Sequence, residues 1–400
     1  MIIKRRTFLQ WGTLASSSFL IPQFLKAFEG RTGLSTGNKA LVILQLSGGN
    51  DGLNTVIPVS NDIYYRERPM LGIAKDKALR LSDDAGIHPE LSFLKSLYDD
   101  GYMAILNNVG YPNPDRSHFR SMDIWQSAAQ SNEFLNSGWL GRWLDEQCVA
   151  CDKPTQALEM DDTLSLALTG EQLKGIALQD PARLYNTSRD PYFTELLKAQ
   201  ASRAAHNENA AYLYQVMAET VSSASYIYEQ SRLRPGSQVY PKTGIGRNLK
   251  TIASLICSDI NTRVYYLSLG SFDTHVNQQD RQQKLFSEMN EAVSSFVTDL
   301  KANHRFDDVL LLTFSEFGRR VSQNAGGGTD HGTANNMFLI GGGLKKKGLL
   351  NGMPDLGNLA DGDLQFQLDF KSVYATVLNK WLQADDRKIL GRQYDLLDFI

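Results

Sequence analysis

The chain has 400 residues, of which 42% are hydrophobic and 21% are charged, and its formal net charge is −3. This is the composition of an ordinary globular protein, and the weak negative charge gives no basis for nucleic-acid binding. After the N-terminus there is no uninterrupted apolar run of roughly 18 residues, so the sequence predicts no membrane-spanning core.

Residues 1–38 are predicted to be an export signal and linker rather than part of the fold. Lys4, Arg5 and Arg6 precede a short, uncharged and weakly apolar stretch, which is the arrangement of a secretory signal. The adjacent arginines followed by Thr-Phe-Leu resemble a twin-arginine signal, which predicts export by the twin-arginine translocase to the periplasm or another extracytoplasmic location. No small-residue cleavage site stands out, so a membrane tether through an uncleaved signal stays open. The alternative is a basic terminus followed by a surface helix.

Short apolar segments followed by Gly, Asn or Asp alternate with helix-period patterns along the rest of the chain. Near-continuous apolar runs are typical of strands covered on both faces. The alternation predicts an α/β fold over residues 39–400, with a doubly wound, mostly parallel sheet flanked by helices. The predicted strands are residues 39–51, 102–110, 262–273, 308–316 and 336–343. The predicted helices are residues 89–101, 118–130, 138–148, 284–303 and 370–383.

Residues 152–245 interrupt this alternation and are predicted to be an insertion or cap region. Residues 152–180 contain three short apolar runs, which we interpret as strands of a small subsheet or flap. Residues 186–230 have a mostly helical pattern that is polar on one face. The inserted region therefore differs in character from the sheet that surrounds it.

The three cysteines give little functional information. Cys148 and Cys151 form a single Cys-x-x-Cys pair, and Cys257 stands alone. An exported protein could oxidise the first pair, but one such pair without a second is poor evidence for zinc. We interpret these cysteines as structural or incidental.

Polar side chains gather where the predicted strands end. Asp51 follows the first strand, Asp273 and His275 follow the third, and Glu316 follows the fourth, while His331 lies beyond a glycine-rich loop. Because ligands bind outside the carboxyl ends of the strands in open α/β sheets, these side chains are expected to converge. Each of them alone reads as an ordinary turn residue. Their joint occurrence predicts a site.

The chemistry of this predicted site suits a metal ion and an anionic substrate. Carboxylates and imidazoles without thiols are ligands for a divalent ion such as zinc, manganese, magnesium or calcium. Such an ion would polarise an ester oxygen and stabilise the charge that develops there. Arg116, Arg319 and Arg320 are candidates for holding a phosphate or sulfate group through paired hydrogen bonds.

Ser117 is the candidate nucleophile. Pro112 and Pro114 prevent an earlier helix start after the second strand, so Ser117 lies where the next helix should begin. A helix N-terminus stabilises an anion and favours formation of an alkoxide. The alternative is that Ser117 merely caps the helix through its hydroxyl. Thr55 is a rival nucleophile, and His118 is left open as a contact to an anion or metal.

Six stretches carry a resemblance to a known family: LSGGNDGLNT, VGYPNPDRSHFRSMDIWQ, GWLGRWLD, FDTH, SEFGRRVSQN and GTDHGTAN. At these stretches the chain resembles the exported family catalogued as domain of unknown function 1501, from about residue 40 to the C-terminus. The resemblance implies an alkaline-phosphatase-like fold and the alkaline phosphatase and sulfatase-like superfamily. Members of that superfamily hydrolyse or transfer phosphate or sulfate esters at a metal site. The expected substrate is accordingly a small-molecule or glycan ester.

The resemblance also implies roles for individual residues. Asp51 would be the acid of the first strand, and Asp273 with His275 would be the Asp-His pair of one metal. His331 would supply the distal histidine, and Ser117 would be the nucleophile.

One position departs from the pattern that the resemblance implies. The Asp-His pair of a second metal would fall on Glu316 and Phe317, where the histidine is missing. This leaves two hypotheses, a metal-dependent ester hydrolase and a non-catalytic envelope or surface protein that retains the fold and one structural ion. A further alternative is that Asp330 serves only to orient His331.

Overall fold

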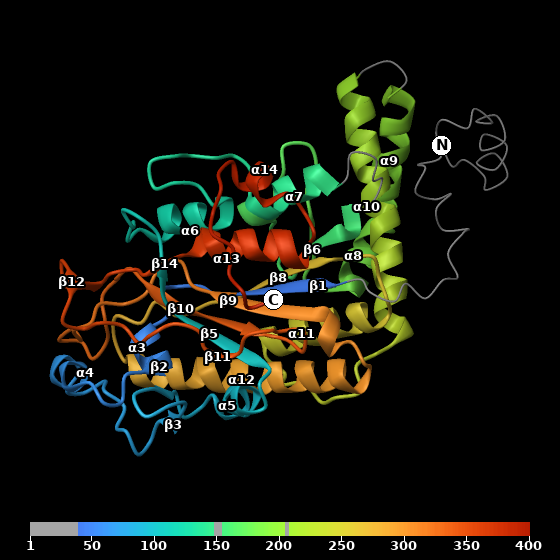
Figure 1. Cartoon of the computed structure of the whole chain (residues 1–400). Coiled ribbons are helices and arrows are strands. Elements are labelled where there is room, and N and C mark those ends of the chain that lie inside the picture. The colour runs from blue at the N-terminus through green and yellow to red at the C-terminus, as the bar shows by residue number, and fades with distance from the viewer. Residues whose placement is uncertain (1–38, 148–153, 205–207) are drawn as a thin grey trace.

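A mixed sheet, nine-stranded over the described residues, forms the centre of the protein (Figure 1). The computed structural model describes residues 39–147, 154–204 and 208–400. The predicted export signal and the Cys148–Cys151 pair lie outside the described residues. The five predicted strands are confirmed as β1 (Ala40–Leu46), β5 (Met103–Gly110), β8 (Val264–Leu269), β9 (Val309–Phe314) and β10 (Asn335–Ile340).

The direction of β10 explains how the polar segments meet. The sheet order is β11-β5-β10-β9-β1-β8-β6-β7, with β14 also paired to β5. Among the described strands of this sheet, β10 runs antiparallel to both of its neighbours, and the other pairs are parallel. The carboxyl ends of β1, β5, β8 and β9 therefore share one edge, and β10 begins at that edge. Residues that precede β10 reach the same place as residues that follow the parallel strands.

Helices cover both faces of the sheet, which confirms the doubly wound α/β prediction (Figure 1). The side chains of β1 alternate between two cores, with Val42 and Leu44 in one and Leu41 and Ile43 in the other. This alternation follows from the period of two in a strand. One core is covered by α5 (Ser92–Asp99), α11 (Gly244–Cys257) and α12 (Gln278–Ala302). The other is covered by α6 (His118–Ser127), α7 (Trp139–Gln147), α13 (Phe370–Thr376), a π-helical turn (Val377–Trp381) and α14 (Asp386–Leu390).

The prediction of a separate subsheet in residues 152–180 is wrong. The first and third apolar runs form β6 (Ala157–Glu159) and β7 (Ile176–Ala177), which extend the main sheet beyond β8 in parallel. The middle run is a 3-10 turn at Leu166–Leu168. The sheet accepts β6 because both of its faces are covered there, and Leu158 is fully buried.

The predicted helical region is confirmed as three helices after β7. They are α8 (Pro181–Ser188), α9 (Pro191–Ala204) and α10 (Glu208–Leu233). Figure 1 shows α9 and the adjoining part of α10 rising side by side away from the sheet. The assignment of residues 152–245 as one insertion stays a prediction. No helix in the described ranges is both long and apolar enough to cross a membrane.

Short elements pack beyond the carboxyl edge of the main sheet. They share a small third core that includes Leu53, Ile57, Tyr64, Val321 and Leu364. This core fixes the loops that surround the predicted site. The elements of this core are α3 (Gly52–Thr55), α4 (Asp62–Glu67), β2 (Val56–Ile57) and the pair β12 (Leu359–Ala360) and β13 (Asp363–Leu364). β2 also begins a three-stranded sheet with β4 (Gly86–Ile87) and β3 (Leu79–Arg80), whose side chains Ile87 and Leu79 pack in the core that contains Val42. β11 (Gly348–Leu349) and β14 (Leu368–Asp369) both pair with the side of β5 that faces away from β10.

Candidate metal centre

Four side chains from three separate segments form a compact group at the carboxyl edge of the sheet. His118 opens α6, Asp273 follows β8 and His331 precedes β10, and one ligand atom from each lies within 4.8 Å of the others. His275 completes the group, because its Nε2 lies 3.1 Å from Asp273 Oδ1 and 3.0 Å from His331 Nε2. The structure thus brings together three of the five predicted ligands and adds His118. We call these four residues the metal centre.

Each imidazole of the metal centre is held from outside through its Nδ1. The Nε2 atoms of all three rings point inward and lie 3.1 to 3.6 Å from an oxygen of Asp273. An acceptor at Nδ1 places the ring proton there and leaves the Nε2 lone pair facing the group. The Nδ1 contacts are His118 with Glu316 (3.0 Å), His275 with Asp330 (3.1 Å) and His331 with the carbonyl of Arg116 (2.9 Å).

The charges around Asp273 favour a carboxylate at neutral pH. Burial raises the pKa of Asp273, but the hydrogen bond from Arg319 and the contact with His331 outweigh it and bring the pKa to about 2. The hydrogen bond to Glu316 raises the pKa of His118. Burial lowers the pKa of His331. The metal centre therefore combines an anionic oxygen with nitrogen donors of different basicity.

Glu316 lies at the predicted site, but its carboxylate is not placed as a metal ligand. It is almost fully buried, and its Oε1 accepts a hydrogen bond from the Gly48 amide (2.8 Å) as well as contacting His118. It is therefore the outer partner of His118. The buried Phe317 ring packs against His118 (4.9 Å between centroids) and His331 (4.6 Å). Phe317 offers no ligand atom, so it adds nothing to the candidate group of ligand atoms formed by His118, Asp273 and His331.

Asp51 is close in the fold but turned away from the metal centre. It is buried, forms an ion pair with the buried Arg68, and accepts a further hydrogen bond from Gln278. Its other oxygen caps α3 by accepting from the Leu53 amide (3.2 Å). Both oxygens are thus engaged in a structural network. Thr55, the rival nucleophile, is fully buried within α3, so a substrate cannot reach its hydroxyl.

Arg319 is a structural clamp rather than an anion binder in this arrangement. It is 2% exposed, and its guanidinium donates to Asp273 Oδ1 at 2.7 Å. Its remaining donors bind main-chain carbonyls of the loops that surround the metal centre. These carbonyls belong to Gly48, Gly49 (2.6 Å), Phe272 (3.0 Å) and Thr329 (2.9 Å). The Arg319 side chain is fully buried, so its guanidinium is not accessible to a substrate.

Ser117 is exposed at the N-terminus of α6, next to His118. Within the described residues its side chain makes no capping hydrogen bond, and Asp115 instead accepts from the Ser117 amide (2.7 Å). The alternative interpretation of Ser117 as a helix cap is therefore wrong. Its predicted role as nucleophile stays a prediction. Arg116 and Arg320 both contact the buried carboxylate of Asp363.

The glycine loop is fixed by Asn324. Its Oδ1 accepts from the amides of Gly326 (2.9 Å) and Gly328 (3.1 Å), and its Nδ2 donates to the His275 carbonyl (3.0 Å). The same nitrogen also donates to Asp330 (3.2 Å), so the loop and the outer partner of His275 form one unit. The expectation that Asp330 orients His331 is wrong, because Asp330 contacts His275 instead.

Gly48 lets the chain after β1 pass close to Asp273. Its φ of +119° is strained for any side chain, and a Cβ there would lie 2.4 Å from the Asp273 amide nitrogen. We expect Gly48→Ala to lower the free energy of unfolding by about 3 kcal/mol and to displace Asp273. Urea unfolding would measure this, with Gly352→Ala as control because nothing lies within 4 Å of a Cβ there. Equal stability of the two variants would contradict the prediction.

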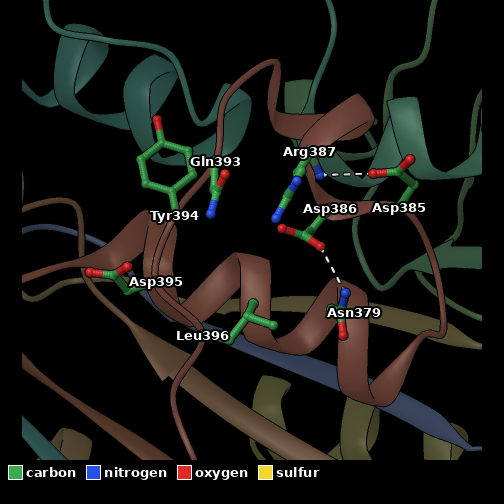
Figure 2. A pocket seen from close by; sticks show the side chains of 8 residues that line it. All are labelled: Asn379, Asp385, Asp386, Arg387, Gln393, Tyr394, Asp395 and Leu396. Carbon is green, nitrogen blue, oxygen red and sulfur yellow. Dashed lines mark hydrogen bonds between the residues drawn. The ribbon is translucent and has the colours of Figure 1, made fainter.

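A polar pocket of about 480 Å³ lies near the C-terminal end of the chain, away from the metal centre (Figure 2). Asp385 caps α14 by accepting from the amides of Arg387 and Lys388, and Asp386 accepts from Asn379 (2.9 Å). These carboxylates are engaged in capping and packing. None of the residues lining this pocket belongs to the metal centre.

The chain is thus an α/β protein with a candidate metal centre at the carboxyl edge of its sheet. The model of the family described as protein of unknown function (DUF1501) matches residues 101–394, and the chain belongs to that family. No curated protein matches it.

Several solved structures are similar to the chain at low sequence identity. A sulfatase from Pseudoalteromonas sp. is 13% identical, with a TM-score of 0.38 over 94% of this chain and 72% of the other. A protein in the alkaline phosphatase superfamily from Vibrio parahaemolyticus is 11% identical, with a TM-score of 0.37 over 88% and 69%. The integral membrane protein lipooligosaccharide phosphoethanolamine transferase A from Neisseria meningitidis is 9% identical, with a TM-score of 0.39 over 88% and 56%.

Proposed function

We propose that this protein is an exported, metal-dependent hydrolase of phosphate or sulfate esters. The observation that carries the proposal is the convergence of three Nε2 atoms on the Asp273 carboxylate, each ring being fixed through Nδ1. Three nitrogen lone pairs and an anionic oxygen that face one another are stabilised together by a cation between them. The residues are therefore arranged as ligands.

The donor set fits zinc or manganese better than magnesium or calcium. Three imidazole nitrogens and one carboxylate suit borderline ions, whereas hard ions prefer ligand sets made of oxygen. When bound, such an ion polarises the ester oxygen and stabilises developing negative charge. Glu316, Asp330 and the Arg116 carbonyl keep the three rings in orientation during this chemistry.

The proposed nucleophile is Ser117, supported by its exposure beside His118 and by a hydroxyl that makes no capping hydrogen bond in the described part of the chain. A bond forms between Ser117 Oγ and the phosphorus or sulfur while the bond to the ester oxygen breaks. The serine proton is released, and the leaving alcohol takes up a proton from water. Attack by water on the seryl ester then returns the free serine. The N-terminus of α6 favours the negative charge on Oγ.

Export by the twin-arginine route is part of the proposal. It is supported by Arg5 and Arg6 and the uncharged stretch that follows them. The periplasm or another extracytoplasmic compartment is the proposed location, where the substrate is a small-molecule or glycan ester. Fusion of residues 1–38 to a reporter protein would test the route, since the signal predicts export that is lost when both arginines are replaced by lysine.

Ser117→Ala is expected to abolish turnover while leaving the metal in place. The purified protein would be analysed for bound metal by mass spectrometry and assayed with p-nitrophenyl phosphate and p-nitrophenyl sulfate. Loss of a covalent nucleophile should lower kcat by about a thousandfold or more. Ser60→Ala, at an exposed serine outside the metal centre, is the matched control. Unchanged turnover in Ser117→Ala would remove Ser117 from the mechanism.

A second candidate function is a non-catalytic envelope protein that carries one structural ion. The buried Phe317 ring favours it, because it packs on His118 and His331 where a second ligand histidine would be needed for a two-metal site. Stoichiometric metal without turnover of either ester would support this function. Turnover that is lost in Ser117→Ala would exclude it.

A further inference from the structure

Asp363 is a buried carboxylate of β13 that lies outside the metal centre. It is 1% exposed, and two guanidinium groups contact it. Arg116 forms an ion pair with Oδ2, and Nε of Arg320 lies 3.6 Å from Oδ1. Apart from these ion pairs, neither oxygen has a hydrogen-bond partner among the described residues. Burying a carboxylate away from water is unfavourable unless positive charge offsets it. The two arginines supply that positive charge.

The three charged groups do not cancel. Two guanidinium groups and one carboxylate leave a net charge of about +1 when all are ionised. The arginine side chains are 39% and 40% exposed, so solvent reaches them although Asp363 is buried. A fixed, partly exposed pair of guanidinium groups is suited to planar, two-point recognition of an oxyanion.

The main-chain atoms of both arginines lie next to the segment that contains His331. The Arg116 carbonyl accepts the hydrogen bond from His331 Nδ1 (2.9 Å), and the residue that follows Arg116 is the proposed nucleophile. Arg319 forms a backbone bridge with His331, and the amide of Arg320 donates to the Asp330 carbonyl (3.0 Å). The ion-pair cluster is therefore built on the same segments as the metal centre.

We propose that Asp363 is a positioning residue, which holds Arg116 and Arg320 as a binding site for the oxyanion of the substrate beside the metal centre. The inference rests on the proposed function, because it assigns the groups that recognise the phosphate or sulfate of that substrate. Arg319, predicted to take part, is excluded by its carbonyl contacts, and its place is taken by Arg320.

The effect of Asp363→Asn separates positioning from simple charge. Removing a negative charge would strengthen phosphate binding if only the net charge mattered. Loss of positioning predicts the opposite, since the two guanidinium groups would no longer be held in place and would lose more rotamer freedom on binding. Binding of inorganic phosphate to the zinc-loaded full chain should therefore weaken about tenfold in Asp363→Asn. Isothermal titration calorimetry at fixed ionic strength would measure it.

Asp361→Asn is the matched control. Asp361 is exposed in the turn between β12 and β13, and its φ of +53° is one that asparagine tolerates. Asp361→Asn removes the same charge as Asp363→Asn from the same hairpin, and it should leave the affinity for phosphate unchanged or slightly higher. Tighter binding in Asp363→Asn as well would overturn the proposal.

Arg320→Ala keeps the proposal testable if Asp363→Asn fails to fold. It should weaken phosphate binding about tenfold, with partial recovery in Arg320→Lys, which restores charge without the planar fork. Unchanged affinity in Arg320→Ala, with zinc bound normally, would overturn the inference alone. A wild-type chain that binds no metal would overturn the proposed function instead, so the two failures are distinguishable.

Discussion

Asp273→Ala is expected to abolish metal binding and ester hydrolysis together. Asp273 is the only anionic member of the metal centre, and all three Nε2 atoms are grouped around its oxygens. Its removal takes away the anionic oxygen and leaves three imidazole nitrogens without a charge that balances the ion. Since loss of an outer partner alone lowers metal affinity about 10- to 100-fold, loss of this ligand should cost more than 100-fold.

The measurement is the ratio of metal to protein after dialysis against a weak chelator, followed by mass spectrometry. Glu316→Gln and Asp330→Asn form a graded series, because each alters an outer partner of one histidine and should weaken binding without abolishing it. His304→Asn is the control for histidine loss elsewhere, since His304 is exposed and has a φ that asparagine accepts. Stoichiometric zinc in Asp273→Ala would contradict the assigned centre.

Arg68→Met is expected to destabilise the fold by about 3–5 kcal/mol, because it leaves the buried Asp51 carboxylate without its charge partner. Arg68 also donates to the Val321 carbonyl (2.8 Å) and the Asn54 side chain (2.9 Å), so loops on both sides of the site lose an anchor. Urea unfolding of the metal-free chain would measure the loss without interference from bound metal.

The double variant with Asp51→Asn is the control for this explanation. Removing the carboxylate as well should recover part of the lost stability, so the two effects are less than additive. Metal content in folded Asp51→Asn then decides the predicted role of Asp51. The geometry implies that metal content is retained, and a folded variant without metal would show that Asp51 is a ligand after all.

The strands and the location of the site were predictable because both have strong local signals. Apolar runs over residues 40–46 and 309–314 are interrupted abruptly by polar residues, and the sheet places those residues at one edge. Asp273 and His275 followed from this rule, whereas His331 was predicted from its place beyond the glycine-rich loop. The antiparallel direction of β10 could not be predicted, because a short apolar run does not indicate in which direction its strand runs in the sheet.

The sequence did not predict which residues of the site are placed as ligands and which orient the ligands, and the reason is physical. Whether a carboxylate binds a metal or orients a ligand depends on distances of a few ångströms between segments far apart in sequence. Glu316 and His118 are 198 residues apart, and nothing near either residue indicates the pairing. Arg68 and Asp363 were missed for the same reason, since a buried ion pair has no period or motif. The position of His118 directly after Ser117 was the one available signal.

The central strand has its partners late in the chain. β1 is bordered by β8 and β9, which begin at Val264 and Val309. During synthesis both edges of this apolar strand stay unpaired until most of the chain has been made, and such non-local pairing is slow and aggregation-prone. Asp273 and His331 follow β8 and β9 in the chain, so the candidate metal centre can assemble only after both neighbours of β1 have been made.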